Sequence, residues 1–215
     1  MNLTSTDFAS RKHLKQILFV GQLFLLISCA NQPTEKRYYS PHALQEEEAT
    51  KLLDLDHSTM SFKAITDWLS KNQTTEITTI VSFKDSALVK KIMPSVRDYG
   101  LYPSKNILSI TSDSILVDKG YPISELKWIL KRHYTNNGKA YQYADSPERA
   151  AIEITLDTNK TAKELKHSLI LLTRVFDEVN SEEKESLLLK VIFDYNRQLP
   201  PPPPPIPIEI VPIVE

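Results

Sequence analysis

Apolar residues in the first half of the chain alternate between strand spacing and helix spacing. Residues 52–55 form a short apolar run and residues 77–83 are rich in β-branched side chains, so both segments are predicted strands. Between them, residues 61–71 repeat apolar side chains every three or four positions, which predicts a helix. Residues 85–86, Asp-Ser, then predict the N-cap of a second helix, which a proline in its interior should bend or split.

The second half shows the same alternation. Ser124 is the predicted cap of a helix whose Leu126, Ile129 and Leu130 face inward, and a longer helix over residues 162–179 carries one apolar stripe. Strand spacing recurs in four segments, at residues 107–111, 115–117, 151–156 and 187–193. The last of these also fits a helix, and we favour a strand because it would complete the second half like the first.

The two halves can be aligned as two copies of one unit. Residues 67–69 match residues 127–129 around a tryptophan, and residues 81–85 match residues 153–157, each ending in aspartate. Each copy would contain a strand, a helix, a strand, an Asp-capped helix and a final strand. Coincidence within an alternating chain is the other interpretation. The predicted fold class is α/β, of the two-layer α+β kind, with helices packed on small sheets.

The N-terminus has the pattern of a secretory signal. Residues 1–16 are polar with three basic side chains, residues 17–27 are apolar, and Ser28 precedes Cys29, the only cysteine. As a helix the apolar run would span about 16 Å, roughly half a bilayer's hydrocarbon core, which is short for a transmembrane anchor. The end of the run resembles a bacterial lipobox, which implies cleavage between Ser28 and Cys29 and lipid on the thiol. The alternative is a buried apolar thiol in a helix.

The same resemblance implies a location. In such lipoproteins an aspartate directly after the cysteine favours the inner membrane, whereas here Ala30 follows, so we expect an outer-membrane protein facing the periplasm. Acyl chains contribute about 0.8 kcal/mol per buried CH₂, so lipid on Cys29 can hold the protein on the membrane. One cysteine cannot form an internal disulfide, so the core must be stabilised by packing alone.

Residues 106–195 present a distinctive order of elements. Residues 107–110 and 114–118 predict a strand hairpin, residues 121–126 lead into a helix, and residues 152–157 predict a strand that ends in aspartate. This order resembles the periplasmic domain of the ExbD/TolR biopolymer-transport family, which implies a helix-covered sheet that acts by binding. The family's transmembrane helix, its membrane-embedded aspartate and the aromatic residue after the strand aspartate are absent. The resemblance therefore does not imply that this chain has the family's proton-using role.

The C-terminus concentrates the prolines, with eight of the fourteen in the last sixteen residues. Six consecutive prolines favour a polyproline II rod about 19 Å long, and an apolar, β-branched run follows them. The stretch is similar to the proline-rich region of TonB proteins, which implies an arm that docks on an envelope protein as an added strand. The predicted partner-binding residues are Pro200, Pro201, Pro202, Pro203, Pro204, Pro205, Ile208, Ile210 and Val211. A disordered tail or a spacer is the alternative.

The amino-acid composition argues against several classes of function. The chain has 26 basic and 27 acidic side chains, so we expect no nucleic-acid partner. Four scattered glycines form no phosphate-binding loop, and we predict no metal site and no cofactor. The histidines are expected to be exposed or half-buried, and Trp68 and Trp128 to lie in the core. One predicted helix carries a basic stripe that could contact anionic lipid or peptidoglycan, or face solvent. Its members are Lys127, Lys131, Arg132 and His133.

One short motif suggests an enzyme. Asp54 and Asp56 follow a predicted strand, as in the phosphoryl-transfer loop of haloacid-dehalogenase phosphatases, where one carboxylate attacks phosphorus beside magnesium and the other transfers a proton. Ser58 stands where that family usually has threonine or valine, and no later pair of acids follows a strand. A solvated strand edge is the alternative, and we expect no enzymatic activity.

The predicted protein is a lipid-anchored envelope protein that binds a partner in envelope assembly or transport. The alternatives are a magnesium-dependent phosphatase and a structural lipoprotein of another family. The predicted organisation is a signal peptide at 1–28, a tether at 29–42, a first α/β unit at 43–112, a second, ExbD/TolR-like unit at 106–195 and a proline-rich tail at 196–215.

Overall fold

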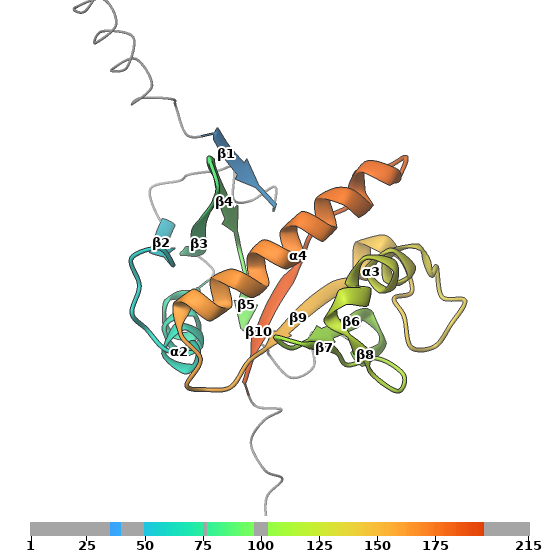
Figure 1. Ribbon diagram of the computed structural model, residues 1–215, viewed down its shortest axis with the longest axis horizontal. Helices are drawn as coiled ribbons and strands as arrows, with labels where there is room; N and C mark the ends of the chain where they lie inside the picture. Colours follow the sequence, from blue (N-terminus) through green and yellow to red (C-terminus); the bar gives the residue numbers. More distant parts are fainter. Residues whose placement is uncertain (1–34, 40–49, 75–76, 97–102, 196–215) are drawn as a thin grey trace, which may run out of the picture. The chain divides into compact units, whose positions relative to one another are not determined.

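The computed structural model describes residues 35–39, 50–74, 77–96 and 103–195 (Figure 1). The chain divides into two units, residues 1–35 and residues 36–215, and every described residue except Glu35 belongs to the second. Within the described ranges, no helix combines the length and apolar character needed to cross a bilayer.

A four-stranded sheet is built from the first part of the described chain. Its strands, in spatial order, are β1 (Glu35–Tyr38), β4 (Leu88–Ile92), β3 (Thr78–Asp85) and β2 (Thr50–Asp54). β2 and β3 are parallel and are joined by α2 (Phe62–Asn72), whereas β3 and β4 form an antiparallel hairpin. α2 begins after Ser61, because the hydroxyl of this residue accepts a hydrogen bond from the Ala64 N–H.

A six-stranded sheet follows. Its spatial order is β5 (Ser95–Val96), β10 (Val191–Asp194), β9 (Ala151–Thr155), β6 (Ile107–Ile110), β7 (Ser114–Ile115) and β8 (Tyr121–Pro122). β5, β10, β9 and β6 are parallel, and β7 and β8 extend the sheet in antiparallel fashion. Short 3₁₀ turns stand at Ser104–Asn106, Ile123–Glu125 and Pro147–Arg149.

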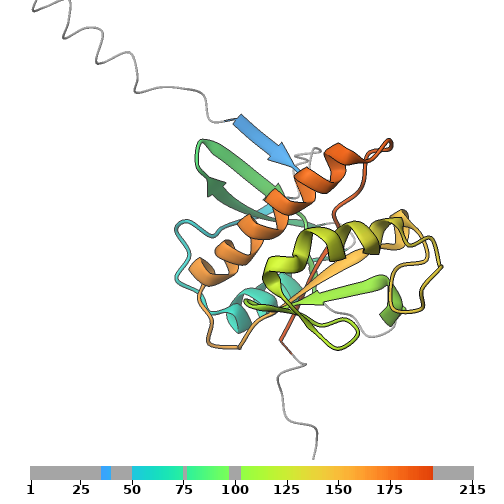
Figure 2. The same ribbon diagram turned by 45° about the vertical axis from the view of Figure 1, so that its right-hand side comes forward.

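Two helices cover one face of this sheet. α3 (Leu126–Thr135) leads into β9, and α4 (Ala162–Glu182) connects β9 to β10. The connection from β6 to β9 and the connection from β9 to β10 each move to the neighbouring strand in the same direction across the sheet. Because crossovers between parallel strands are right-handed, both helices lie on the same face of the sheet (Figure 2). β9 lies centrally and all five of its residues are buried, as expected for a strand covered on both faces.

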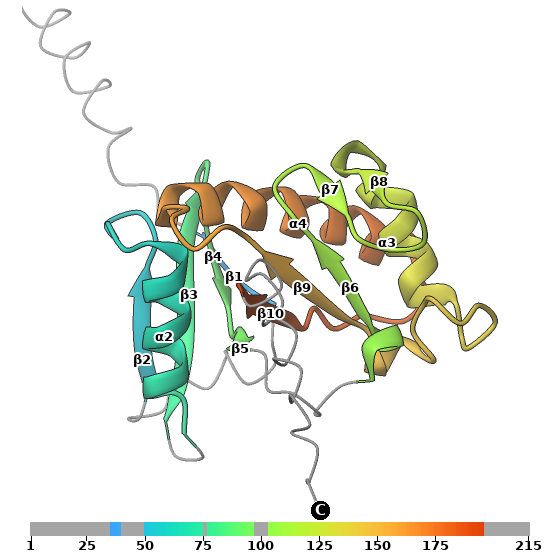
Figure 3. The ribbon, with the colours of Figure 1, turned by 90° about the horizontal axis from the view of Figure 1, so that it is seen from below.

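α4 is the element around which the core is organised. Its N-terminus is held by a capping box, in which Thr161 accepts from the Glu164 N–H and the Glu164 carboxylate accepts from the Thr161 N–H. The helix also contacts α2 and the β3–β4 hairpin, so it joins both sheets to one core (Figure 3). The predicted apolar stripe is fully buried, and its members are Leu165, Leu169, Leu172 and Phe176.

Most of the predicted elements are confirmed. The helices predicted at 61–71 and 162–179 correspond to α2 and α4, and the ambiguous segment at 187–193 is a strand from residue 191 onward, where β10 begins. The class is mixed α/β, with sheets and three α-helices in the described residues. The predicted cap of α3 is wrong: Ser124 lies inside a 3₁₀ turn, and no side chain caps the helix.

The helix predicted after residues 85–86 is also wrong. These residues are not an N-cap, because Asp85 ends β3 and Ser86 starts a two-residue turn with a left-handed φ of 57°. Asp and Ser favour turns as strongly as caps, so the local pattern did not distinguish the two. The chain returns as β4, and the hairpin pairs Asp85 with Leu88.

This hairpin contradicts the duplicated unit. Residues 81–85 are followed by an antiparallel strand, whereas the matched residues 153–157 are followed by the long helix α4. The two segments share an aspartate at the strand end but lead into different structures. Over the described residues, the halves are therefore not two copies of one strand–helix layout.

Candidate functional site

The residues assigned to lipid attachment and tail binding lie outside the described residues. This applies to the cleavage site Ser28–Cys29 and to the predicted partner-binding residues, which are Pro200, Pro201, Pro202, Pro203, Pro204, Pro205, Ile208, Ile210 and Val211.

The Asp-x-Asp motif lies at the end of β2, the edge strand of the four-stranded sheet. Asp54 accepts from the Asp56 N–H at 2.9 Å and lies 2.8 Å from His57 Nδ1, so this histidine has an orienting carboxylate that the sequence spacing did not suggest. Asp56 accepts from the Lys84 N–H at 2.8 Å and pairs with Lys166 on α4. All four carboxylate oxygens therefore have partners, and they tie the β2–α2 connection to β3 and α4.

These contacts also determine the charge state of Asp54. Partial burial acts to raise its pKa, but the hydrogen bonds with His57 and the Asp56 N–H hold the pKa below its ordinary value. The carboxylate is therefore ionised at neutral pH. In the described part of the chain, no three His, Cys, Asp or Glu side chains are placed to share a metal ion.

A hollow runs along the N-terminal half of α4. Its volume is about 630 Å³, within the range of ligand-binding clefts. A second hollow of about 270 Å³ shares Ser112, Leu156 and Lys160 with the first and extends it to Leu116, which is 44% exposed. We call the two together the α4 trough. Residues that line it include Ser112, Asp113, Leu116, Leu156, Asp157, Lys160, Lys163, Glu164, Lys166, His167 and Ile170.

The fold explains why the trough exists. α3 packs beside the C-terminal half of α4, where Lys127 of α3 pairs with Glu178 of α4 at 3.0 Å. The N-terminal half of α4 faces the β6–β7 turn at Ser112 instead. A stretch of helix and a turn thus leave an elongated space between them.

The trough carries lysines and acids in equal number. Lys160, Lys163 and Lys166 line it, and so do Asp113, Asp157 and Glu164. The pKa of Glu164 falls to about 2 because Lys160 pairs with it at 2.8 Å and the Thr161 N–H donates to it. Lys166 is paired with Asp56. Lys163 and His167 have no polar partner among the described residues. Lys163, Lys166 and His167 are spaced to share one face of α4, a pattern that is visible in the sequence but was not among the predicted site residues.

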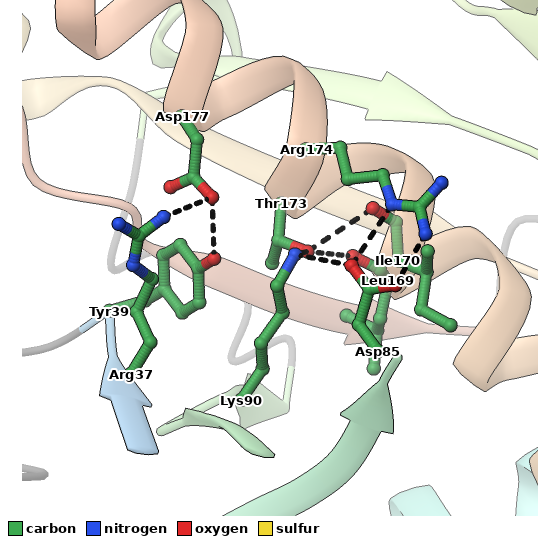
Figure 4. A network of polar contacts seen from close by, with 9 residues as sticks. All are labelled: Arg37, Tyr39, Asp85, Lys90, Leu169, Ile170, Thr173, Arg174 and Asp177. Carbon is green, nitrogen blue, oxygen red and sulfur yellow. Dashed lines mark hydrogen bonds and ion pairs between the residues drawn. The ribbon is translucent and has the colours of Figure 1, made fainter. Parts of the chain in front are cut away.

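A buried ionic network fixes α4 against the β3–β4 hairpin (Figure 4). Lys90 Nζ lies 2.9 Å from Asp85 Oδ2 and donates to Thr173 Oγ1 at 2.9 Å, and both charged side chains are buried. Arg174 donates to both oxygens of Asp85, at 3.0 and 2.5 Å. These hydrogen bonds hold the pKa of Asp85 far below its ordinary value, the bond from Arg174 having the largest effect.

The same helix holds β1. Asp177 accepts from Arg37 at 2.7 Å and from the Tyr39 hydroxyl at 3.0 Å (Figure 4). Burial and the nearby Asp177 carboxylate raise the pKa of Tyr39 well above its ordinary value, so the hydroxyl stays protonated and can donate. The edge strand is thereby joined to α4 as well as to β4.

Two lysines of the basic stripe on α3 are about half exposed, as the solvent-facing interpretation predicts, whereas the prediction for Trp128 is wrong. Lys127 and Lys131 pair with Glu182 at 3.1 and 2.8 Å, so these cations already have acidic partners within the chain. Trp128 is not in the core: it is 41% exposed, and its ring contacts Tyr121 edge-on at 5.3 Å between centroids. Trp68 is partly buried and packs against the core.

His133 is fully buried, contrary to the expectation of an exposed or half-buried histidine. Its Nδ1 accepts from the Ala144 N–H at 3.4 Å, and its Nε2 has no partner among the described atoms. Burial lowers its pKa to about 4, so the side chain is neutral at pH 7. It helps to hold the 136–146 loop against α3 and contributes nothing to a basic surface.

The chain matches no known protein-family model, and no curated protein or solved structure matches it either.

Proposed function

We propose that this protein is a lipid-anchored protein of the bacterial cell envelope that acts by binding, with Cys29 attached to the membrane and the proline-rich tail docking on an envelope partner. The observation that supports this most is the order of elements from Ile107 to Asp194. It contains a strand hairpin, a helix, a strand, a helix and a strand, as the resemblance to the ExbD/TolR periplasmic domain implies. Peptidoglycan is a further ligand in this proposal, at the outer-membrane side of the periplasm.

The contacts of Asp54 and Asp56 favour binding over the phosphatase hypothesis. Phosphoryl transfer by this type of motif needs a carboxylate that is free to attack phosphorus and bind magnesium. Here each oxygen of the two carboxylates has a partner within the chain, and β2 is an edge strand. The motif serves to hold three elements together.

Attachment of lipid to Cys29 can be measured directly. Cells that express the full chain and are fed labelled palmitate should incorporate the label into the protein, and Cys29→Ser should lose it entirely, because the chain has no other cysteine. The variant should also leave the membrane fraction. Label that persists in Cys29→Ser would contradict the anchor.

Docking by the tail can be tested with charge substitutions. Ile208→Asp combined with Ile210→Asp should reduce capture of envelope proteins by the tagged full chain about tenfold or more, because each buried isoleucine contributes about 2 kcal/mol. The matched control is Leu52→Asp, which alters an apolar residue of β2 that is 53% exposed and should leave capture unchanged. Equal capture by all three proteins would remove the role of the tail.

A further inference from the structure

The two hollows of the α4 trough adjoin each other beside the β6–β7 turn, where Ser112 lines both of them. Their charged linings differ. Among the described residues, Asp113 and Asp157 line the smaller hollow and not the larger, whereas Lys163 lines the larger hollow and not the smaller. Charges of opposite sign therefore lie in different parts of one elongated space.

The other charged side chains of the trough already have partners of opposite charge within the chain. Lys160 pairs with Glu164 at 2.8 Å, and Lys166 pairs with Asp56. Because the two charges of each pair largely cancel at the distance of a ligand, these pairs attract an ionic ligand only weakly. The charges that remain for a ligand are the two carboxylates of the smaller hollow and the Lys163 ammonium of the larger one.

The two carboxylates of the smaller hollow are placed to accept hydrogen bonds. Asp113 and Asp157 are exposed, and neither forms an ion pair within the described residues. The hydroxyls of Ser114 and Thr111 donate to one oxygen of Asp113, at 2.8 and 2.9 Å, and hold the pKa of this carboxyl below its ordinary value. Ionised carboxylates accept hydrogen bonds and donate none, so this hollow selects a cationic donor, for which an ammonium group is suited.

The larger hollow offers the opposite chemistry. Lys163 and His167 stand one turn apart on α4, and neither has a polar partner among the described residues. The Lys163 ammonium can donate to a carboxylate without breaking an existing contact. Apolar contact for the rest of a ligand comes from Leu116, which is 44% exposed in the smaller hollow, and from the half-buried Ile170 in the larger.

A ligand that matches both hollows carries an ammonium group and a carboxylate that are some distance apart. In a free amino acid the two groups are attached to the same carbon, which is too close for them to occupy separate hollows. In a short peptide they are separated by about 3.3 Å for each extended residue. The volume of the larger hollow, about 630 Å³, also leaves room for the backbone and small side chains of such a peptide.

We propose that the α4 trough binds a short peptide whose two termini are free, with its ammonium group at Asp113 and Asp157 and its carboxylate at Lys163. The site uses residues of β9, α4 and the β6–β7 turn alone. It requires neither lipid on Cys29 nor the proline-rich tail, and it therefore gives the protein a small-ligand site in addition to the proposed docking function.

Trialanine is a suitable probe, and calorimetry on the full chain measures its binding. Small ligands of this size bind in or below the millimolar range. N-acetyl-trialanine lacks the ammonium group and trialanine amide lacks the carboxylate, so each should bind about tenfold or more weakly than trialanine, because each loses a charge-assisted contact. Lys139→Gln, which changes an exposed lysine outside the trough, should leave the affinity for trialanine unchanged.

Substitutions in the trough then assign each terminus to its hollow. Asp113→Asn with Asp157→Asn should weaken trialanine about tenfold but leave N-acetyl-trialanine unchanged, because the group that these acids contact is already missing from that peptide. Lys163→Gln should weaken trialanine by a similar factor and leave trialanine amide unchanged. The asparagine amide oxygen can still accept from Ser114 and Thr111, so the turn is retained.

Four results would overturn the proposal. The first is no binding of trialanine in the millimolar range, and the second is equal affinity for trialanine and its two blocked forms. The third is an equal loss for blocked and free peptides in the trough variants, since the substituted residues would then not contact the blocked groups. The fourth is a loss in Lys139→Gln as large as that in Lys163→Gln, which would indicate attraction by overall charge. Partner capture and lipid labelling are not measured, so the docking function can fail separately.

Discussion

Asp85→Asn should lower the free energy of unfolding by about 3–5 kcal/mol, the cost of leaving a buried charge without its partner. Lys90 is buried, and after the substitution its ammonium would retain Thr173 but no carboxylate within the network. The amide is close in size to the carboxylate, so the turn after β3 can still form. Urea unfolding followed by tryptophan fluorescence measures the change.

The surface pair Lys63–Asp67 provides the matched control for this experiment. Both side chains are about half exposed and pair at 2.6 Å with i,i+4 spacing on α2. Asp67→Asn removes one charge just as Asp85→Asn does, but we expect a loss below about 1 kcal/mol, because solvent screens exposed pairs. Similar losses in the two variants would show that the Asp85 network does not act as a buried ion pair.

Acidification should destabilise the protein through His133. The folded-state pKa is about 4, against about 6.5 in the unfolded chain, so between these values the unfolded chain binds a proton that the folded chain does not. The contribution of the neutral histidine is complete above pH 6.5, declines as the pH falls, and levels off below pH 4. Between pH 7.5 and 4.5 the loss from this residue should be about 2–3 kcal/mol.

His133→Phe isolates that contribution. Phenylalanine cannot titrate and remains beside Tyr134 and Tyr143, so any fixed cost of the substitution is the same at both pH values. The loss of stability between pH 7.5 and 4.5, measured by urea unfolding, should be about 2–3 kcal/mol smaller than in the unsubstituted chain. The exposed His167, changed to Gln, should leave the pH dependence as it was. Equal slopes in all three proteins would contradict a neutral, buried His133.

The accuracy of the sequence predictions depended on whether the relevant interactions were local. α2 and α4 were predictable because caps and apolar spacing lie within the helices, as with Ser61 and the stripe from Leu165 to Phe176. β4 was not predictable, because its segment combines apolar residues at helical spacing with two lysines, a pattern that also fits an amphipathic helix. Its Lys90 can be buried because Asp85 and Thr173, the latter 83 residues later, lie beside its ammonium. Contacts of that separation leave no mark on the local pattern.

The candidate site follows the same rule. Lys163 and Lys166 of the α4 trough could be placed on one helix face from their spacing, but the hollow beside them depends on where α3 and the β6–β7 turn lie. The prediction that His133 is exposed or half-buried was wrong, because its burial also depends on a distant part of the fold. A single histidine at the end of a basic helix looks exposed, and only the loop carrying Ala144 and Tyr143 closes over it.

The attachment of β1 to Asp177 has a mechanical consequence. With the proposed anchor at Cys29, tension along the chain enters the described structure at β1, a short strand at a sheet edge whose first residues are exposed. The load then passes into α4 through the Arg37 and Tyr39 contacts with one carboxylate. An exposed edge strand detaches at far lower free energy than a helix buried along its length. β1 would therefore yield first and lengthen the tether, while the other strands of both sheets and α4 remain folded.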